Sequence, residues 1–264
     1  MYNLMKFELY KLKYNTAFKI SISIILFLIF LVLKLFYSRL DIIVIFSFIY
    51  DRKTFGFFIN KFHDISSPTA LEFFISSFGF SVILIILSLF LVGSYIVNEY
   101  SCGTVKNTLS YGHSRLKVYL SKIITIYLSI FILLILLLFV PLITALILGW
   151  VKSISAYTAA RLFKYTLIIY LIFAAIASIY ACLAAIIKSK SIIIALGMTI
   201  LFINAGGFLI NFKFDKYTPV IMLMKLGSLN SPTSDICSTI SICSIIILIS
   251  LVLGITVFKN QDIR

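Results

Sequence analysis

The chain has 264 residues, of which 62% are hydrophobic and only 12% are charged. Because a soluble domain carries about 25% charged residues, this composition excludes a soluble globular protein and indicates an integral membrane protein. The formal net charge of +14 would suggest nucleic-acid binding in a soluble chain. In a membrane protein, an excess of Lys and Arg in cytoplasmic loops explains it more simply, so we expect no nucleic-acid partner.

Residues 1–14 place apolar side chains on one side of a helix and Lys6 and Lys13 on the other. This pattern predicts a short elbow helix at the membrane interface, with lysines that reach toward lipid headgroups. The segment could also be the start of the first membrane-spanning helix. No small-x-small cleavage site follows the next apolar run, so we expect an uncleaved spanning helix.

A helix needs about 20 mostly apolar residues to cross a bilayer, and the sequence contains six segments of this kind. They predict one all-α membrane domain over residues 1–264, with approximate spans 17–35, 70–97, 123–150, 165–187, 191–210 and 236–258. An even number of spans places both termini on one side. The segments assigned to that side have the higher density of Lys and Arg, which favours cytoplasmic termini.

The segments between the spans carry further signals. Thr69 and Glu72 have the spacing of a capping box at a helix start. The apolar pieces Ile42–Tyr50 and Pro219–Met224 are both too short to cross, which predicts an interfacial position for residues 42–50.

Polar and small residues interrupt the fifth predicted span at Asn204, Gly206 and Gly207, which favours a bend or a broken helix. Asn204 could contact a substrate or form a hydrogen bond to a neighbouring helix. Gly206 and Gly207 could serve helix packing or act as hinges of a gate.

The sequence contains no motif for an enzyme. No G-x-x-x-x-G-K-[ST] nucleotide loop occurs, and the two histidines lie far apart without an H-E-x-x-H motif. The spans are almost free of ionisable residues, which argues against an ion-coupled carrier. We therefore expect no catalytic residue, no metal site and no cofactor bound by this chain, and any movement must be driven by a partner.

Residues 98–122 form a polar, basic stretch between two long apolar runs. Gly103 and Thr104 predict the start of a short helix, with Thr104 as its N-cap and Gly112 near its C-terminus. Ser114 is placed to cap the following helix, which leads through Arg115 into the third span. A short helix between two long ones transmits rigid-body motion well.

This stretch resembles the permease subunits of type-2 ABC exporters, including those of bacitracin-resistance and lantibiotic-immunity transporters. Residues 119–122 and the C-terminal residues 258–264 also resemble that family. The resemblance implies that residues 213–235 supply short re-entrant or interfacial pieces near an external gate. The resemblance implies that residues 104–110 are a coupling helix that docks on a separate ATPase subunit. The implied docking residues are Glu99, Gly103, Thr104, Val105, Lys106, Asn107, Leu109, Gly112, Ser114 and Arg115.

Simpler roles remain open for the charged residues of this stretch. Glu99 could be an interfacial carboxylate balanced by Lys106 or Arg115. Lys106, Arg115 and Lys117 could face anionic lipid headgroups without any further role.

The resemblance implies a multi-pass permease of a bacterial cell membrane that exports an amphipathic substrate, such as an antimicrobial peptide or a lipid-linked antibiotic, in resistance or immunity. Its partners would be a homodimeric ATPase that binds ATP and Mg²⁺, a second permease copy or paralogue, and membrane lipid. The alternative is a non-transporting sensor or scaffold that uses the same stretch to hold a cytoplasmic partner.

Overall fold

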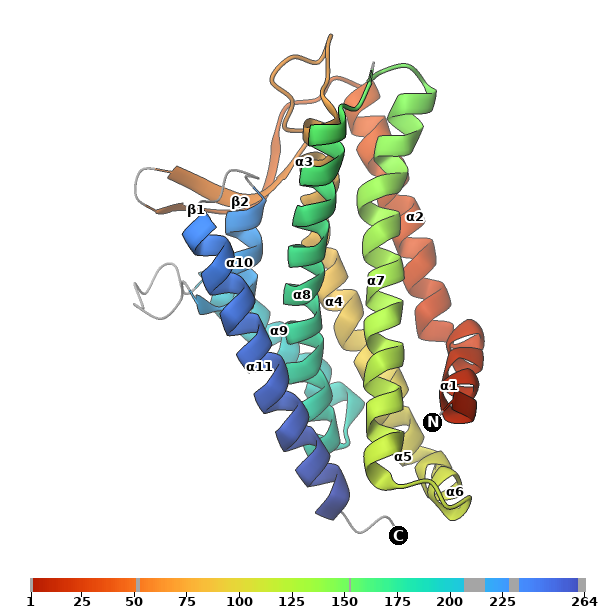
Figure 1. The fold of residues 1–264 in the computed structure, drawn as a ribbon. Coiled ribbons are helices and arrows are strands. Elements are labelled where there is room, and N and C mark those ends of the chain that lie inside the picture. The colour runs from red at the N-terminus through yellow and green to blue at the C-terminus, as the bar shows by residue number, and fades with distance from the viewer. Residues whose placement is uncertain (1, 51–52, 152, 207–216, 228–232, 261–264) are drawn as a thin grey trace.

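A computed structural model of the protein describes residues 2–50, 53–151, 153–206, 217–227 and 233–260. Long helices run side by side through most of the chain, and a two-stranded hairpin lies at one end of the bundle (Figure 1). We call this the hairpin end. The helices α1 (Tyr2–Tyr14), α5 (Asn98–Ser101) and α6 (Thr104–Ser110) lie at the opposite end, the α6 end.

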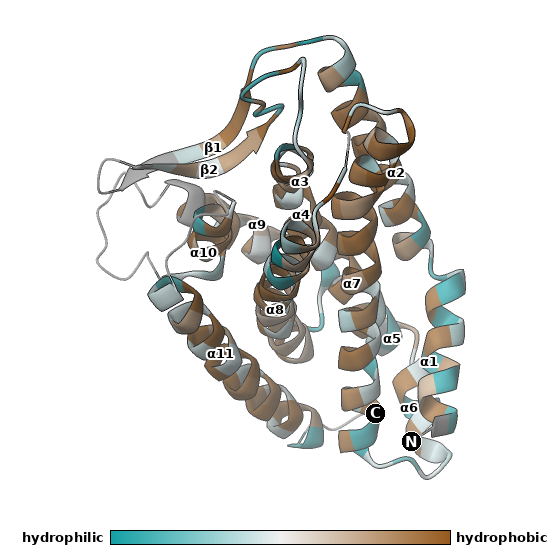
Figure 2. Ribbon diagram, turned by 45° about the horizontal axis from the view of Figure 1, so that its top comes forward, coloured by the Kyte–Doolittle hydropathy of each residue, from teal (hydrophilic) through white to brown (hydrophobic). Residues whose placement is uncertain are grey.

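Within the described ranges, five helical segments are long and apolar enough to cross a membrane. They are α2 (Thr16–Tyr37), the segment Ser81–Ser101, α7 (Arg115–Ile147), α8 (Ala156–Ile187) and α11 (Thr233–Asn260). Hydrophobic residues dominate these helices, whereas hydrophilic residues gather on α1 (Figure 2). The prediction of a multi-pass helical membrane protein is therefore confirmed.

The fifth predicted span coincides with α9 (Lys190–Gly206). The apolar part with described side chains, Lys190–Ile203, is shorter than a membrane crossing requires. Asn204 and Gly206 belong to the last turn of α9, but their side-chain surroundings, like all of Gly207, lie outside the described part of the chain. The count of six spans stays a prediction.

The second predicted span is not one continuous helix. It is divided into α3 (Ala70–Phe78), α4 (Ser81–Val92) and the π-helix η1 (Gly93–Val97), and α5 follows it directly. Close packing explains the glycine at the first break, because a Cβ atom on Gly79 would lie 2.4 Å from the carbonyl oxygen of Phe58. The predicted capping box is confirmed at the start of α3, where the Thr69 N–H donates to Glu72 and the Glu72 N–H donates to Thr69.

The hairpin joins β1 (Ile43–Tyr50) to β2 (Lys53–Ile59) in antiparallel register. The sequence prediction for residues 42–50 was an interfacial segment and did not include strands. Aromatic and β-branched residues favour extended backbone over a helix, and Gly56 leaves room for the partner strand. The hairpin base is fixed by a 2.7 Å hydrogen bond from the Asn60 N–H to the Ser76 hydroxyl of α3.

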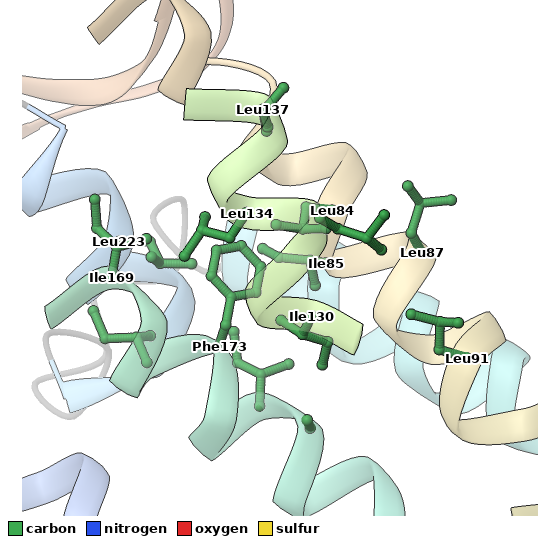
Figure 3. Close-up of a cluster of buried hydrophobic side chains, with 14 of the residues drawn as sticks. Leu84, Ile85, Leu87, Leu91, Ile130, Leu134, Leu137, Ile169, Phe173 and Leu223 are labelled. Atoms are coloured by element: carbon green, nitrogen blue, oxygen red, sulfur yellow. The ribbon is translucent and has the colours of Figure 1, made fainter. Parts of the chain in front are cut away.

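The core lies between α4, α7 and α8, with α10 (Pro219–Leu226) closing it near the hairpin end. Figure 3 shows Ile85, Leu134 and Phe173 from three helices in one cluster, and all three are fully buried. Alanines such as Ala177 and Ala181 are also buried, and small residues allow helices to approach closely in membranes. By contrast, only 17% of the apolar segment of α11 is buried.

Candidate functional site

Two glycines bound the short helix α6. Gly103 precedes it with φ of 67° and Gly112 follows it with φ of 80°. A Cβ atom at either position would meet nothing within 4 Å, so the left-handed backbone, rather than lack of space, explains glycine there. The helix bounds agree with the predicted residues 104–110.

The caps differ in detail from the prediction. Gly103 occupies the N-cap position, and Thr104 is the first helical residue. The Thr104 hydroxyl donates to the carbonyl oxygen of Glu99 over 3.3 Å and is therefore directed back to α5 rather than to the start of α6. Ser114 does precede α7 as predicted, but its hydroxyl forms no cap hydrogen bond there.

The two faces of α6 differ in character. Val105 and Thr108 are buried against the bundle, and Leu109 is half-buried. Lys106, Asn107 and Ser110 are exposed on the other side. The helix therefore rests on the bundle through a small apolar face and presents a polar face outward.

A charge cluster fixes α5 to two other helices. It consists of Glu8 and Lys11 from α1, Glu99 from α5 and Lys122 from α7. Lys11 Nζ lies 3.0 Å from Glu99 and 3.3 Å from Glu8, and Lys122 Nζ lies 3.7 Å from Glu8. Lys122 also forms an ion pair with Glu99. Each acid in the cluster thus contacts both bases.

Burial makes this pairing energetically important. Glu8 is fully buried and the Lys122 side chain is 2% exposed. An isolated charge at such a position would lose its hydration without compensation, so removing one partner of a buried pair costs about 3–5 kcal/mol. One oxygen of Glu8, Oε2, has no hydrogen-bond partner among the described residues. The cluster holds together only while α1, α5 and α7 keep their positions.

An aromatic contact fixes the opposite side of α5. The ring of Tyr100 lies 6.1 Å from that of Phe258 on α11, and Lys188 Nζ lies 5.3 Å from the centre of the Tyr100 ring. Arg115 at the start of α7 donates to the carbonyl oxygen of Lys259 over 2.6 Å. The end of α11 is therefore joined to the same region.

The π-helix η1 lies directly before α5. A π-helix is often a single-turn irregularity at a functional position in an α-helix. A Cβ atom on Gly93 would lie 3.3 Å from Lys190 Cγ, so α9 packs closely on this turn. The Ser94 hydroxyl lies 3.4 Å from the Asn15 side chain, which also caps α2. Thus η1 contacts both the corner between α1 and α2 and the start of α9.

The structure brings together the predicted residues of the α6 region but changes the partners of Glu99. Neither Lys106 nor Arg115 pairs with it; Lys11 and Lys122 do. The sequence prediction did not include the charge cluster. Glu8 could have drawn attention as the only acid in residues 1–40, and Lys122 as a base at the start of an apolar span.

A family model described as ABC-2 family transporter protein matches residues 4–206. The chain belongs to this family. No curated protein sequence matches the chain. The matched region of this ABC-2 family member contains most of α1 and all of α5, α6 and α7, and with them every residue of the charge cluster.

Membership in this family indicates what kind of complex the chain belongs to. ABC-2 permeases are the membrane-embedded subunits of transporters that associate with an ABC ATPase. Among the described residues of this ABC-2 permease, no group of three or more His, Cys, Asp or Glu side chains could hold a metal ion. The α6 region has an exposed polar helix face, and the adjoining α5 is joined to α1 and α7 through the ion pairs of Glu99.

Proposed function

We propose that the protein is the permease subunit of an ATP-driven exporter and that α6 is the helix that docks on the ATPase. The charge cluster carries this proposal. It joins the segment next to α6 to α1 and α7 through partly buried ion pairs, so a displacement of α6 reaches the spanning helices.

The transmission path starts at the outward face of α6. A partner that contacts Lys106, Asn107 and Ser110 pushes on a helix whose other face, Val105 and Thr108, rests on the bundle. Because Thr104 is hydrogen-bonded to Glu99, the push continues into α5. The ion pairs of Glu99 with Lys11 and Lys122 then move α1 and α7 with α5.

In the proposed cycle, ATP and Mg²⁺ bind to the partner ATPase, and its closure favours one of two arrangements of the permease. A partner shifts such an equilibrium only by the difference in its affinity for the two states. The π-helix η1 lies between α4 and α5, where a change in helix pitch would reorient α6 relative to the core. Two permease copies, or this chain and a paralogue, enclose the path.

The α6 end is assigned to the cytoplasm of a bacterial cell. This orientation is supported by the higher density of Lys and Arg in the segments assigned to this side. It also agrees with the position of α1 and the last turn of α11, which lie at the same end of the bundle.

We propose an amphipathic substrate, either an antimicrobial peptide or a lipid-linked antibiotic, with a role in resistance or immunity. The apolar spans and the resemblance of residues 98–122 to exporters of such compounds support this choice. The substrate would leave the membrane rather than pass as a hydrated ion, because the spans contain few ionisable residues.

The proposal is tested by co-purification with an ABC ATPase encoded by the same organism, followed by measurement of ATPase activity in proteoliposomes with candidate peptides. Lys106→Glu should weaken ATPase binding about tenfold, because it reverses a charge on the outward face of α6. Lys117→Glu is the matched control on α7, where an exposed base lies outside α6. A stable complex that contains no ATPase would contradict the exporter proposal and favour the scaffold alternative.

A further inference from the structure

A recess lies at the hairpin end, on the opposite side of the bundle from α6. Three segments form it: the end of α2, the loop between β2 and α3, and the residues that follow α7. It has a volume of about 620 Å³, within the range of roughly 300–1,000 Å³ that is typical of small-molecule sites. Its lining residues are Phe36, Tyr37, Arg39, Ile65, Ser66, Pro68, Gly149 and Trp150.

Aromatic rings hold one wall of the recess in place. The ring of Phe36 lies 4.8 Å from that of Trp150 and 4.8 Å from that of Phe73 on α3. Phe62 packs on the same ring at 4.9 Å. Such packed pairs contribute about 0.5–1.5 kcal/mol each beyond the burial of their surface. The wall is therefore formed before any ligand arrives.

Arg39 gives the recess its charge. It is the one charged residue among the described residues that line the recess. Its side chain is exposed and forms no ion pair with any described residue. Its backbone is left-handed, with φ of 49°, and its N–H donates to the Phe36 carbonyl oxygen over 3.0 Å.

The acid in the adjoining loop does not neutralise Arg39. Asp64 accepts hydrogen bonds from the Ser66 N–H, the Ser66 hydroxyl and the Ser67 hydroxyl at 2.9, 2.6 and 2.8 Å. These donors, with Ser66 first, lower the pKa of Asp64 to about 2. Asp64 therefore stays ionised at neutral pH and organises the loop, while its carboxylate does not line the recess.

An apolar surface continues from the recess along α7. Ile143, Ile147 and Leu148 are 49%, 77% and 57% exposed, and Gly149 follows them directly into the lining. Ile143 and Ile147 are one turn apart and share a helix face. A ligand with its polar group in the recess would thus have a hydrophobic path toward the middle of the bilayer.

We infer that this recess binds the phosphate group of an amphiphilic lipid, with Arg39 against the phosphate and the apolar tail along the last turns of α7. A guanidinium suits phosphate because its N–H donors match two oxygens at once. Trp150 and Tyr37 suit the same depth, because Trp and Tyr are typical of the membrane–water interface. This site does not depend on the proposed docking of an ATPase and would remain if that docking failed.

The test uses the purified full-length chain in dodecyl maltoside micelles, which contain no phosphate, with a phosphatidic acid that carries a photoreactive group in its acyl chain. We expect cross-links on residues 143–148, and competition by unlabelled dioleoyl phosphatidic acid. Arg39→Asn should reduce the labelling about tenfold, since it removes the charge-assisted contact. Asn tolerates the left-handed backbone at this position. Arg39→Lys should retain part of the labelling, and Lys164→Gln, which removes an exposed base of α8, should not change it.

Three results would overturn the inference. Arg39→Asn could retain the labelling of the unmodified chain. Dioleoylglycerol, which lacks the phosphate, could compete as well as phosphatidic acid. Inorganic phosphate alone could compete equally well, which would show that binding does not require a lipid tail. The competition arms use the unmodified chain, so they decide the question even where a variant folds poorly.

Discussion

Glu99 shows how much one side chain at the α6 end depends on its neighbours. Its carboxylate is shared between Lys11 and Lys122, and its carbonyl oxygen accepts the hydroxyl of Thr104. Lys122 is in turn shared between Glu99 and Glu8. Loss of either charge therefore leaves an excess of the other sign in a buried place, and the effects of single substitutions should not be additive.

We predict that Lys122→Met lowers the free energy of unfolding by about 3 kcal/mol, since it leaves two acids with one base. Adding Glu99→Gln should recover at least about 1 kcal/mol, because Glu8 and Lys11 then remain as a balanced pair. Thermal unfolding in detergent with a thiol-reactive dye measures both. The buried Cys182 and Cys243 report unfolding once the exposed Cys102 and Cys237 are replaced by Ser. Additive losses would contradict the predicted coupling.

The helices α7 and α11 pack closely where Gly254 meets Tyr119. Most of α11 is open to its surroundings, yet Gly254 is buried against Tyr119. A Cβ atom on Gly254 would lie 2.0 Å from the Tyr119 hydroxyl oxygen. That hydroxyl has no hydrogen-bond partner among the described residues. The small residue is therefore what lets α11 approach α7 at the α6 end.

This packing predicts that Gly254→Ala destabilises the protein by about 1–3 kcal/mol through overpacking. Tyr119→Phe should cost little or nothing by itself, because it removes a buried hydroxyl that has no partner. The double variant should be less destabilised than Gly254→Ala alone, since part of the clash is gone. Midpoints from the same thermal assay provide the measurement, and a double variant as unstable as Gly254→Ala would disprove the proposed clash.

The orientation of the whole molecule in the membrane decides which end of the bundle faces the cytoplasm and which faces the outside. The exposed cysteines lie at opposite ends: Cys102 comes just before α6, and Cys237 lies in the first turns of α11 near the hairpin end. Our proposed orientation places Cys102 in the cytoplasm and Cys237 outside.

A membrane-impermeant maleimide should therefore label Cys237 in intact cells and label Cys102 only after the membrane is permeabilised. The variants Cys237→Ala and Cys102→Ala assign each signal, and the buried Cys182 and Cys243 should stay unlabelled in both conditions. Labelling of Cys102 in intact cells would reverse the orientation and remove α6 from the reach of an ATPase.

The sequence alone predicted the features that depend on neighbouring residues or on the apolar character of a whole segment. Long apolar runs specified the spanning helices because a bilayer requires internal backbone hydrogen bonds. Gly103 and Gly112 marked the ends of α6 because each needs a left-handed backbone. Thr69 and Glu72 specified their cap because both groups lie within one turn.

Contacts between distant parts of the chain were decided only by the tertiary structure. The pairing of Lys11 with Glu99 joins residues 88 positions apart, and no local pattern relates them. The close contact of Gly79 with the carbonyl of Phe58 and the recess at Arg39 both depend on segments that meet only after folding. By itself the sequence determined a helical membrane protein with a short polar helix between its second and third spans. The fold decided which charges are buried together, because burial depends on every helix that surrounds them.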